Sequence, residues 1–368
     1  MQTRPIDEAT FSFLSHDRVF SRKRSGKNRR EEMTPRMRSF RRVLFAVAAI
    51  GGSLALAYAL WTPGLVVKDG RNDKGTNGIW LAHGWLGGDE WFIRNAKTGE
   101  LSKYRSKESI GALFQKLTRH GVRDVFPHLC PVSPTGQLPP TNPEQVERFL
   151  DAAGTIRVFP WIGGPSESNA LISEPEWRAK FASEVAALLA RHPRLAGVHV
   201  NIEPLRSGNV DFLTLLDQLS AILPRGRLIS VAAYPPPTRW HPVPEVHWEE
   251  PYFREVARRC DQLAVMMYDA GQRFPKTYQK LMSDWTDEVL VWSEGKPVLL
   301  GVPTYDDAGV SYHDPRVENL ENAVPGIHKA LAAAPLRENY QGIAIYCDWE
   351  TSEAEWSWLR ANFLRQPK

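Results

Sequence analysis

Eight short apolar runs alternate with longer amphipathic segments, and this alternation restricts the fold of the chain more than any other feature. The runs are 78–85, 122–129, 156–162, 196–203, 228–234, 263–269, 298–305 and 342–348. Each is seven or eight residues long, as is typical of a buried strand, and each is followed by enough residues for a helix. Eight such units predict an α/β fold, a (β/α)8 TIM barrel. A doubly wound sheet is the alternative, but no glycine-rich phosphate loop follows any run.

Helix start and stop signals support the assignment of the intervening segments. Asn142 precedes a proline, which combines an N-cap residue with proline at the first helical position. Ser173 and Ser352 each begin a pattern that fits a capping box. Gly121 and Gly154 stand where glycines end helices. Further helices are expected to begin near Lys107, Val210, Pro251, Thr277 and Leu320.

The first 61 residues differ in composition from the rest and predict a membrane anchor. Residues 1–42 hold twelve Lys or Arg and five acidic residues, whereas residues 43–61 form an uncharged apolar stretch of nineteen. Such a stretch is long enough to cross a bilayer as a helix, and its basic side is expected to stay in the cytoplasm. We therefore expect a basic cytoplasmic tail, one transmembrane helix, a polar linker at 62–77 and an extracytoplasmic barrel at 78–368. A signal peptide, with secretion of the barrel after cleavage near residues 57–59, is the alternative.

The charge of the remaining residues argues against a nucleic-acid partner. These 326 residues carry 34 basic and 37 acidic side chains, so the net charge of +4 comes from the tail. The three cysteines are too few for a disulfide framework and allow at most one disulfide.

The run 196–203 has two different faces. With the two-residue period of a strand, one face is made of β-branched residues and the other is polar. The polar side chains are His199, Asn201 and Glu203. Burying a polar group without a partner costs roughly 2–7 kcal/mol, so this face is either a solvated edge or a functional site. Within a barrel, we expect His199 to be a hydrogen-bonded interior residue rather than a catalyst.

The active site of such a barrel lies at the C-terminal ends of its strands. The polar and aromatic residues at these ends are His83, Trp85, His128, Trp161, Asn201, Glu203, Tyr234, Tyr268, Asp269, Tyr305, Asp306, Tyr346 and Asp348. His83, His128 and Asp269 could bind a metal ion, but no HxH or HxxxH spacing supports this. We therefore expect neither a metal ion nor another cofactor.

Two strand ends carry motifs that resemble those of the family 18 glycoside hydrolases, the chitinase-like enzymes. The run 196–203 is similar to the DGxDxDxE signature of that family, and residues 266–269 are similar to its MxYD motif. Residues 161–164 are similar to the SIGG turn, and Tyr346 stands where the family usually has a tryptophan under the sugar. The resemblance covers roughly residues 78–365 and implies the same barrel fold.

The resemblance also implies roles for individual residues. Of the signature's carboxylates only Glu203 remains, and the other three positions are Ala196, His199 and Asn201. Glu203 would protonate the leaving glycosidic oxygen. Asn201 would orient the substrate's N-acetyl group, which attacks the anomeric carbon, although an amide lacks the charge of a carboxylate. Tyr268 would donate a hydrogen bond to the attacking carbonyl.

Seven further side chains at the strand ends are expected to bind substrate. They are Asp269, Tyr346, Trp161, His83, Trp85, Tyr305 and Asp348. Tyr268 and Tyr346 could instead be core or rim aromatics, and Asp269 could only cap the next helix.

These patterns predict a membrane-anchored glycoside hydrolase that cleaves an N-acetylhexosamine-containing polysaccharide outside the cytoplasm by substrate-assisted acid catalysis. A two-carboxylate mechanism, with Asp306 or Asp348 as the partner of Glu203, is a minor alternative. A third possibility is a catalytically inactive barrel that binds glycan or scaffolds an envelope complex. It follows from the loss of three acidic positions in the signature.

Overall fold

The computed structural model describes residues 35–238, 243–306, 310–334 and 337–365, divided between a unit at residues 1–60 and a unit at 61–368. The first unit contains α1 (Pro35–Leu60), whose segment Ser39–Leu60 is long and apolar enough to cross a membrane. The side chains of this segment are exposed. The predicted apolar helix is therefore confirmed, and either a signal sequence or a single anchor fits it. Most of the basic tail, residues 1–34, lies outside the described residues.

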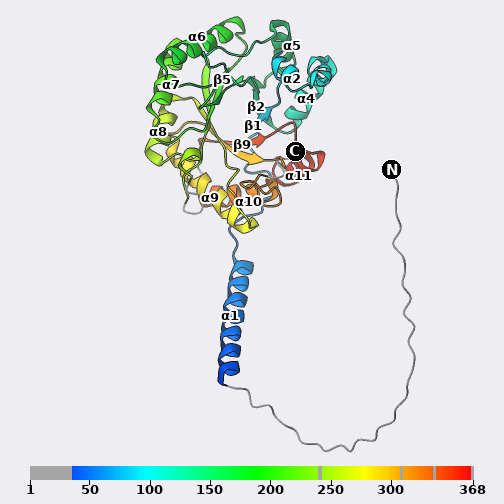
Figure 1. Ribbon diagram of the computed structural model, residues 1–368. Coiled ribbons are helices and arrows are strands. Elements are labelled where there is room, and N and C mark those ends of the chain that lie inside the picture. Colours follow the sequence, from blue (N-terminus) through cyan, green and yellow to red (C-terminus); the bar gives the residue numbers. More distant parts are fainter. Residues whose placement is uncertain (1–34, 239–242, 307–309, 335–336, 366–368) are drawn as a thin grey trace, which may run out of the picture. The chain divides into compact units, whose positions relative to one another are not determined.

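The second unit is a barrel of parallel strands. The strands are β1 (Asn77–Leu81), β2 (Val122–Pro127), β3 (Arg157–Val158), β4 (Trp161–Pro165), β5 (Gly197–Glu203), β6 (Leu228–Ala233), β7 (Gln262–Val265), β8 (Val298–Pro303) and β9 (Tyr340–Tyr346). Their order is β3-β2-β1-β9-β8-β7-β6-β5-β4. β3 and β4 are parts of one strand, interrupted at residues 159–160; β3 pairs with β2 and β4 with β5, which closes the barrel. Each predicted run overlaps one of these strands, so the predicted α/β barrel is confirmed (Figure 1).

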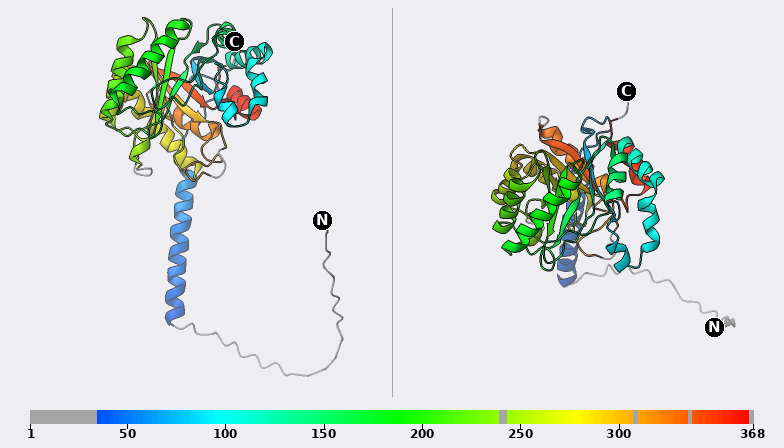
Figure 2. Two further views of the ribbon diagram at one scale, coloured as in Figure 1. Left: turned by 45° about the horizontal axis from the view of Figure 1, so that its top comes forward. Right: turned by 90° about the horizontal axis from the view of Figure 1, so that it is seen from above.

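Helices follow the strands in sequence and lie outside them (Figures 1 and 2). The helices of this unit are α2 (Glu90–Arg94), α3 (Leu101–Arg105), α4 (Lys107–Arg119), α5 (Pro143–Ala153), α6 (Pro175–Arg191), α7 (Val210–Ile222), α8 (Glu250–Arg259), α9 (Pro275–Trp292), α10 (Leu320–Ala333) and α11 (Glu353–Asn362). Two short 3-10 helices, η1 (Thr98–Glu100) and η2 (Pro244–Val246), lie in the loops.

The helix starts agree with the sequence signals, with one exception. Asn142 accepts a hydrogen bond from the backbone N–H of Gln145 (3.0 Å), and Ser352 forms a complete capping box at the start of α11. The prediction for Ser173 is wrong, because α6 begins at Pro175 with Glu174 as an N-cap residue that makes no side-chain cap. Proline favours the first helical position, which leaves Ser173 one residue too early to cap.

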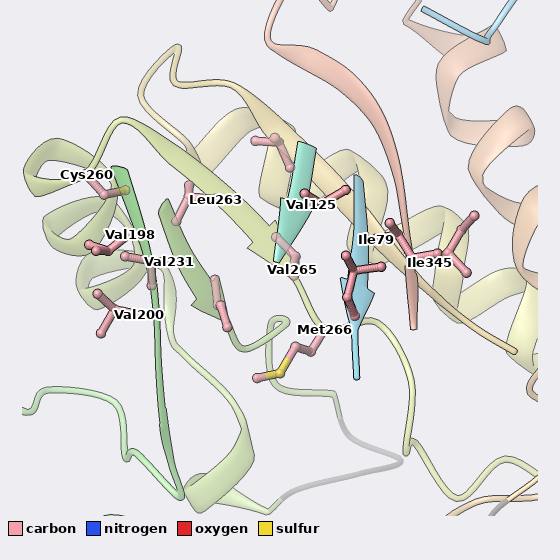
Figure 3. Packing of buried hydrophobic residues seen from close by; sticks show 14 of the residues in the cluster. Ile79, Val125, Val198, Val200, Val231, Cys260, Leu263, Val265, Met266 and Ile345 are labelled. Carbon is pink, nitrogen blue, oxygen red and sulfur yellow. The ribbon is translucent and has the colours of Figure 1, made fainter. Parts of the chain in front are cut away.

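Two hydrophobic clusters lie on the two sides of the barrel wall. The larger cluster fills the space between strands and helices, and Figure 3 shows Val198 and Val200 of β5 in it. The smaller cluster fills the barrel interior and consists of Trp80, Phe126, Phe159, Trp161, Ala264, Leu299 and Ala344. The apolar face of β5 therefore points to the helices, and its polar face points into the barrel.

The end of the barrel where the strands begin is closed by polar contacts. The fully buried carboxylate of Asp124 accepts hydrogen bonds of 2.6–2.7 Å from Arg157, Gln262 and Gln341. The expected linker at 62–77 packs onto the same unit. Its Asp73 accepts a hydrogen bond from the backbone of Arg365 (3.0 Å). These contacts make the segment part of the barrel unit rather than a free connection.

Candidate active site

Glu203, the last residue of β5, is the carboxylate around which the candidate site is built. Its Oε1 accepts a hydrogen bond from Asn201 Nδ2 (2.7 Å), and its Oε2 accepts one from the hydroxyl of Tyr234 (3.2 Å). Burial raises the pKa of Glu203; these two hydrogen bonds oppose the rise, and the charge of Asp269 adds to it. In the described part of the chain, no Lys, Arg or His forms an ion pair with Glu203. The carboxyl group therefore keeps its proton to a higher pH than an exposed glutamate does.

Asn201 lies one pleat deeper on the same face of β5. Its side chain is buried, and its Oδ1 has no hydrogen-bond partner among the described residues. On β4, Gly163 is its register partner, with φ of +132°. A Cβ at Gly163 would come within 1.9 Å of the backbone oxygen of Asn201, so only glycine permits this approach of the two strands. The amide therefore has its donor committed to Glu203 and its acceptor available.

His199 is the deepest polar residue of this face and is fully buried. Its Nε2 lies 3.0 Å from Trp80 Nε1, and its Nδ1 lies 2.9 Å from the hydroxyl of Ser230. Because an indole N–H can only donate, Nε2 is the acceptor and Nδ1 carries the hydrogen. Burial lowers the pKa of His199 to about 3, so the ring stays neutral. The expected interior, hydrogen-bonded role of His199 is confirmed.

Aromatic rings form the floor beside Glu203. Tyr268 stacks on Tyr346 with a centroid distance of 5.0 Å and an angle of 19°. Trp80 meets both rings edge-on, at 6.4 Å and 5.6 Å. Trp161 is buried and lies edge-on to Tyr346 at 6.4 Å, and Tyr305 meets Tyr346 at 5.2 Å. The structure thus brings together four of the predicted aromatic residues, with Trp80 beneath them.

Asp269 follows Tyr268 in the chain and contacts a cluster of buried polar side chains. It adopts a left-handed backbone conformation with φ of +58°, and its Oδ1 accepts a hydrogen bond from the hydroxyl of Tyr305. His313 Nδ1 lies 3.3 Å from the same oxygen. Burial lowers the pKa of His313, but the carboxylates of Asp269 and Glu318 outweigh it and raise the pKa to about 10. Glu318 accepts hydrogen bonds from the backbone N–H groups of residues 270 and 272 (3.0 and 2.9 Å) and thereby fixes the turn after Asp269.

A pocket of about 400 Å³ lies beside Glu203 and Asp269. Glu203, Tyr268 and Asp269 line it on one side, and the remaining lining residues come from the segments after β6, β7 and β8 and from α9. These are Tyr234, Pro235, Val243, Val246, His247, Met266, Trp285 and Tyr312. The pocket therefore presents two half-buried carboxyl groups, those of Glu203 and Asp269, to a largely apolar wall.

Of the seven predicted substrate-binding residues, Asp269 lines this pocket. Tyr346, Trp161 and Tyr305 belong to the aromatic floor but do not line the pocket, and the other three belong to neither. Trp85 is only 3% exposed and packs against Tyr104 in the outer core, so its expected contact with substrate has no support. His83 lines a second pocket of about 340 Å³, where it stacks on Trp91 at 4.5 Å. Asp348 accepts a hydrogen bond from the backbone N–H of residue 82 (2.7 Å), and burial raises its pKa to about 7.

The partners considered for a two-carboxylate mechanism gain no support either. Asp348 ties β9 to β1, and Asp306 is exposed. Neither residue lines the pocket of Glu203. The metal set considered from sequence is also divided, since His83 and His128 line the second pocket whereas Asp269 lines the first.

Sequence reasoning missed several residues that complete the site. Tyr234 was visible as a strand-end tyrosine, but its hydrogen bond to Glu203 depends on β6 lying next to β5. Trp80 lies in the middle of its apolar run, where nothing distinguishes it from core filler. His313 and Glu318 lie in the long loop after β8, which carries no motif.

Comparisons with known proteins agree with the fold. No protein-family model matches the chain, and no curated protein matches it significantly in sequence. Among solved structures, the spore cortex-lytic enzyme SleL of Bacillus cereus aligns with a TM-score of 0.52 and 11% identity, over 78% of this chain and 75% of that one. A class V chitinase of Pseudomonas fluorescens Pf-5 aligns with a TM-score of 0.47 and 16% identity, over 77% of this chain and 98% of that one. The similarity to SleL confirms the parallel barrel that the resemblance to family 18 implied; at this identity the likeness extends to the fold alone.

Proposed function

We propose that the chain is a glycoside hydrolase that cleaves an N-acetylhexosamine-containing polysaccharide, with Glu203 as the general acid. The observation that carries this proposal is the environment of the Glu203 carboxyl group. Its carboxyl group lies at the wall of an apolar pocket, has a raised pKa and pairs with no cation among the described residues. A general acid needs to hold a proton at the working pH and to reach the leaving oxygen. A carboxylate held only for structure would instead be neutralised by a buried partner.

Asn201 supports a substrate-assisted rather than a two-carboxylate reaction. Its Oδ1 is buried and without a partner in the described residues, which is costly unless a ligand fills it. The N–H of an acetamido group would satisfy this acceptor and turn the acetamido carbonyl toward the anomeric carbon. Tyr268 would then donate its hydroxyl hydrogen to that carbonyl. The stacked rings of Tyr268 and Tyr346 would support the apolar face of the sugar.

The location follows from α1. We propose that residues 43–61 anchor the chain in a membrane, with the basic tail in the cytoplasm and the barrel outside. Extraction of membranes at alkaline pH tests the anchor, because an integral helix stays in the pellet. Protease added to intact cells should digest the barrel of the anchored protein, and its protection there would reverse the proposed orientation.

The decisive experiment replaces Glu203 by Gln in the full chain purified in detergent. Cleavage of N-acetylated oligosaccharides should fall by about 100-fold or more, as expected for loss of a general acid. Glu184→Gln is the matched control, because Glu184 is a glutamate of α6 that pairs with Lys180 at the helix surface. Unchanged turnover in Glu203→Gln would refute the proposal.

A glycan-binding barrel without activity is the second candidate, favoured by the residues at positions 196, 199 and 201, which are not acidic. The same proteins decide between the two. Tight binding of the oligosaccharide to the unmodified chain without any cleavage supports the binder, and Glu203-dependent turnover excludes it.

A further inference from the structure

We propose that Asp269, His313 and Glu318 form a binding site for one divalent transition-metal ion beside the pocket of Glu203. One ligand atom from each residue lies within 4.8 Å of the other two. The site rests on these side chains alone and is independent of whether the chain hydrolyses a glycan.

His313 provides the observation that points to an ion. Its side chain is fully buried, and its Nε2 lies 3.0 Å from the backbone carbonyl of Tyr305. A carbonyl oxygen can only accept, so Nε2 carries a hydrogen and Nδ1 faces the two carboxylates. Nδ1 is 3.3 Å from Asp269 Oδ1 and 3.8 Å from Glu318 Oε2, and it makes no hydrogen bond within the described residues.

These separations suit shared coordination. Zinc binds imidazole nitrogen and carboxylate oxygen at about 2.0–2.2 Å, so two ligands on one ion are about 3–4 Å apart. A small adjustment of side chains would place an ion between Nδ1 and the two oxygens. One nitrogen and two oxygen ligands favour Zn²⁺ or Mn²⁺ over Mg²⁺, which prefers oxygen ligands and water.

The surroundings of the three ligands match the outer shell of a metal centre. A metal-bound histidine usually donates its other N–H to a carbonyl or carboxylate, and ligating carboxylates are themselves hydrogen-bonded. His313 donates to the carbonyl of Tyr305, and Asp269 accepts from the hydroxyl of the same tyrosine. Glu318 accepts two backbone N–H groups. All three ligands are therefore oriented before an ion arrives.

Charge gives a further reason for a cation. Glu318 has a fully buried side chain, and Asp269 adds a second carboxylate. Within the described residues, neither carboxylate forms an ion pair with Lys or Arg. A proton on His313 compensates one negative charge, whereas a divalent ion compensates both. Asp269 is 39% exposed on its side chain and lines the pocket, which leaves room for a water ligand.

Metal binding to the full chain in detergent tests the site directly. The protein is prepared without a polyhistidine tag, stripped with chelator and dialysed against Zn²⁺, Mn²⁺ or Mg²⁺, and bound metal is measured by elemental analysis. We expect about one equivalent of Zn²⁺ or Mn²⁺, little Mg²⁺, and a melting temperature raised by the bound ion. His313→Gln and Glu318→Gln should weaken binding by more than about 100-fold, and Tyr305→Phe by about 10- to 100-fold.

His192→Gln is the matched control, because His192 contacts a glutamate (Glu147, 2.6 Å) on the other side of the barrel wall, outside the pocket. It should bind metal as the unmodified chain does, and so should Glu203→Gln, which separates this test from that of hydrolysis. If the His313 and Glu318 variants fail to fold, the visible spectrum of bound Co²⁺ is compared between the unmodified chain and Tyr305→Phe. This comparison then decides whether Co²⁺ binds at the proposed site. Less than about a tenth of an equivalent bound, or equal binding by His313→Gln, overturns the proposal and leaves His313 as an imidazolium between two carboxylates.

Discussion

Asn201 offers the sharpest test of the proposed chemistry, because the resemblance to family 18 implies an aspartate at this position. Asn201→Ala removes the 2.7 Å hydrogen bond to Glu203 and the buried acceptor proposed to hold the acetamido group. A hydrogen bond to a charged group contributes about 1.5–3 kcal/mol. If it acts in the transition state, its loss lowers kcat about 10- to 150-fold.

Asn201→Asp changes the charge while keeping the shape. A carboxylate at this position would repel the ionised form of Glu203, so the pKa of Glu203 should rise further. Hydrolysis should then persist to higher pH than in the unmodified chain. Steady-state cleavage of a chromogenic N-acetylated oligosaccharide, followed over a range of pH, measures both effects.

Asn339→Ala is the control for a lost amide. Asn339 donates hydrogen bonds of 2.6 and 2.7 Å to Leu290 and Ser293 just before β9, at the opposite end of the barrel. It should lower the free energy of unfolding by about 1 kcal/mol per hydrogen bond and leave turnover unchanged. Full activity in Asn201→Ala, with Glu203→Gln inactive, would refute the role of the amide. Lower activity in Asn201→Asp than in Asn201→Ala would refute the orientation of an acetamido group.

Three further predictions follow from the pKa shifts and from the barrel interior. Hydrolysis should decline as pH rises through the raised pKa of Glu203. Glu203→Gln should melt higher than the unmodified chain at about pH 8 but not at about pH 3, where the carboxyl is largely protonated in both folded and unfolded states. Asp348→Asn should likewise melt higher above pH 7 and equally below its ordinary pKa of 3.8; equal melting at alkaline pH would contradict burial as the cause. Trp80→Phe removes the donor to His199 and should cost about 1–3 kcal/mol of unfolding free energy, and denaturant titration that detects no loss would contradict the assigned tautomer.

The fold could be predicted because its signals are local and repeated. Most strand runs are largely apolar, as expected for parallel strands covered on both sides, and helices such as the one after Asn142 begin with recognisable caps. The interruption between β3 and β4 was not predicted. It occurs at Phe159-Pro160, where a proline cannot donate to the ladder.

The site was predictable where one strand carries it and unpredictable where several elements combine. The alternation in β5 placed His199, Asn201 and Glu203 on one face, and the barrel rule placed Glu203 at the open end. Trp85 looked equivalent to His83 by position, but its large ring packs in the outer core, which residue spacing alone cannot reveal. His313 and Glu318 come 44 and 49 positions after Asp269 in the sequence, so only folding brings the three residues together.

The polar face of β5 explains why a reduced set of acidic residues still forms a coherent site. Solvent access rises along the strand from His199, which is fully buried, to Glu203 at the pocket. An aspartate at position 199 would bury a charge, whereas a neutral histidine is satisfied by Trp80 and Ser230. An amide at position 201 likewise adds no second negative charge beside Glu203. Because neither neighbour on the strand is charged, burial remains the main cause of the raised pKa of Glu203, and the proposed acid works without the other carboxylates of the family signature.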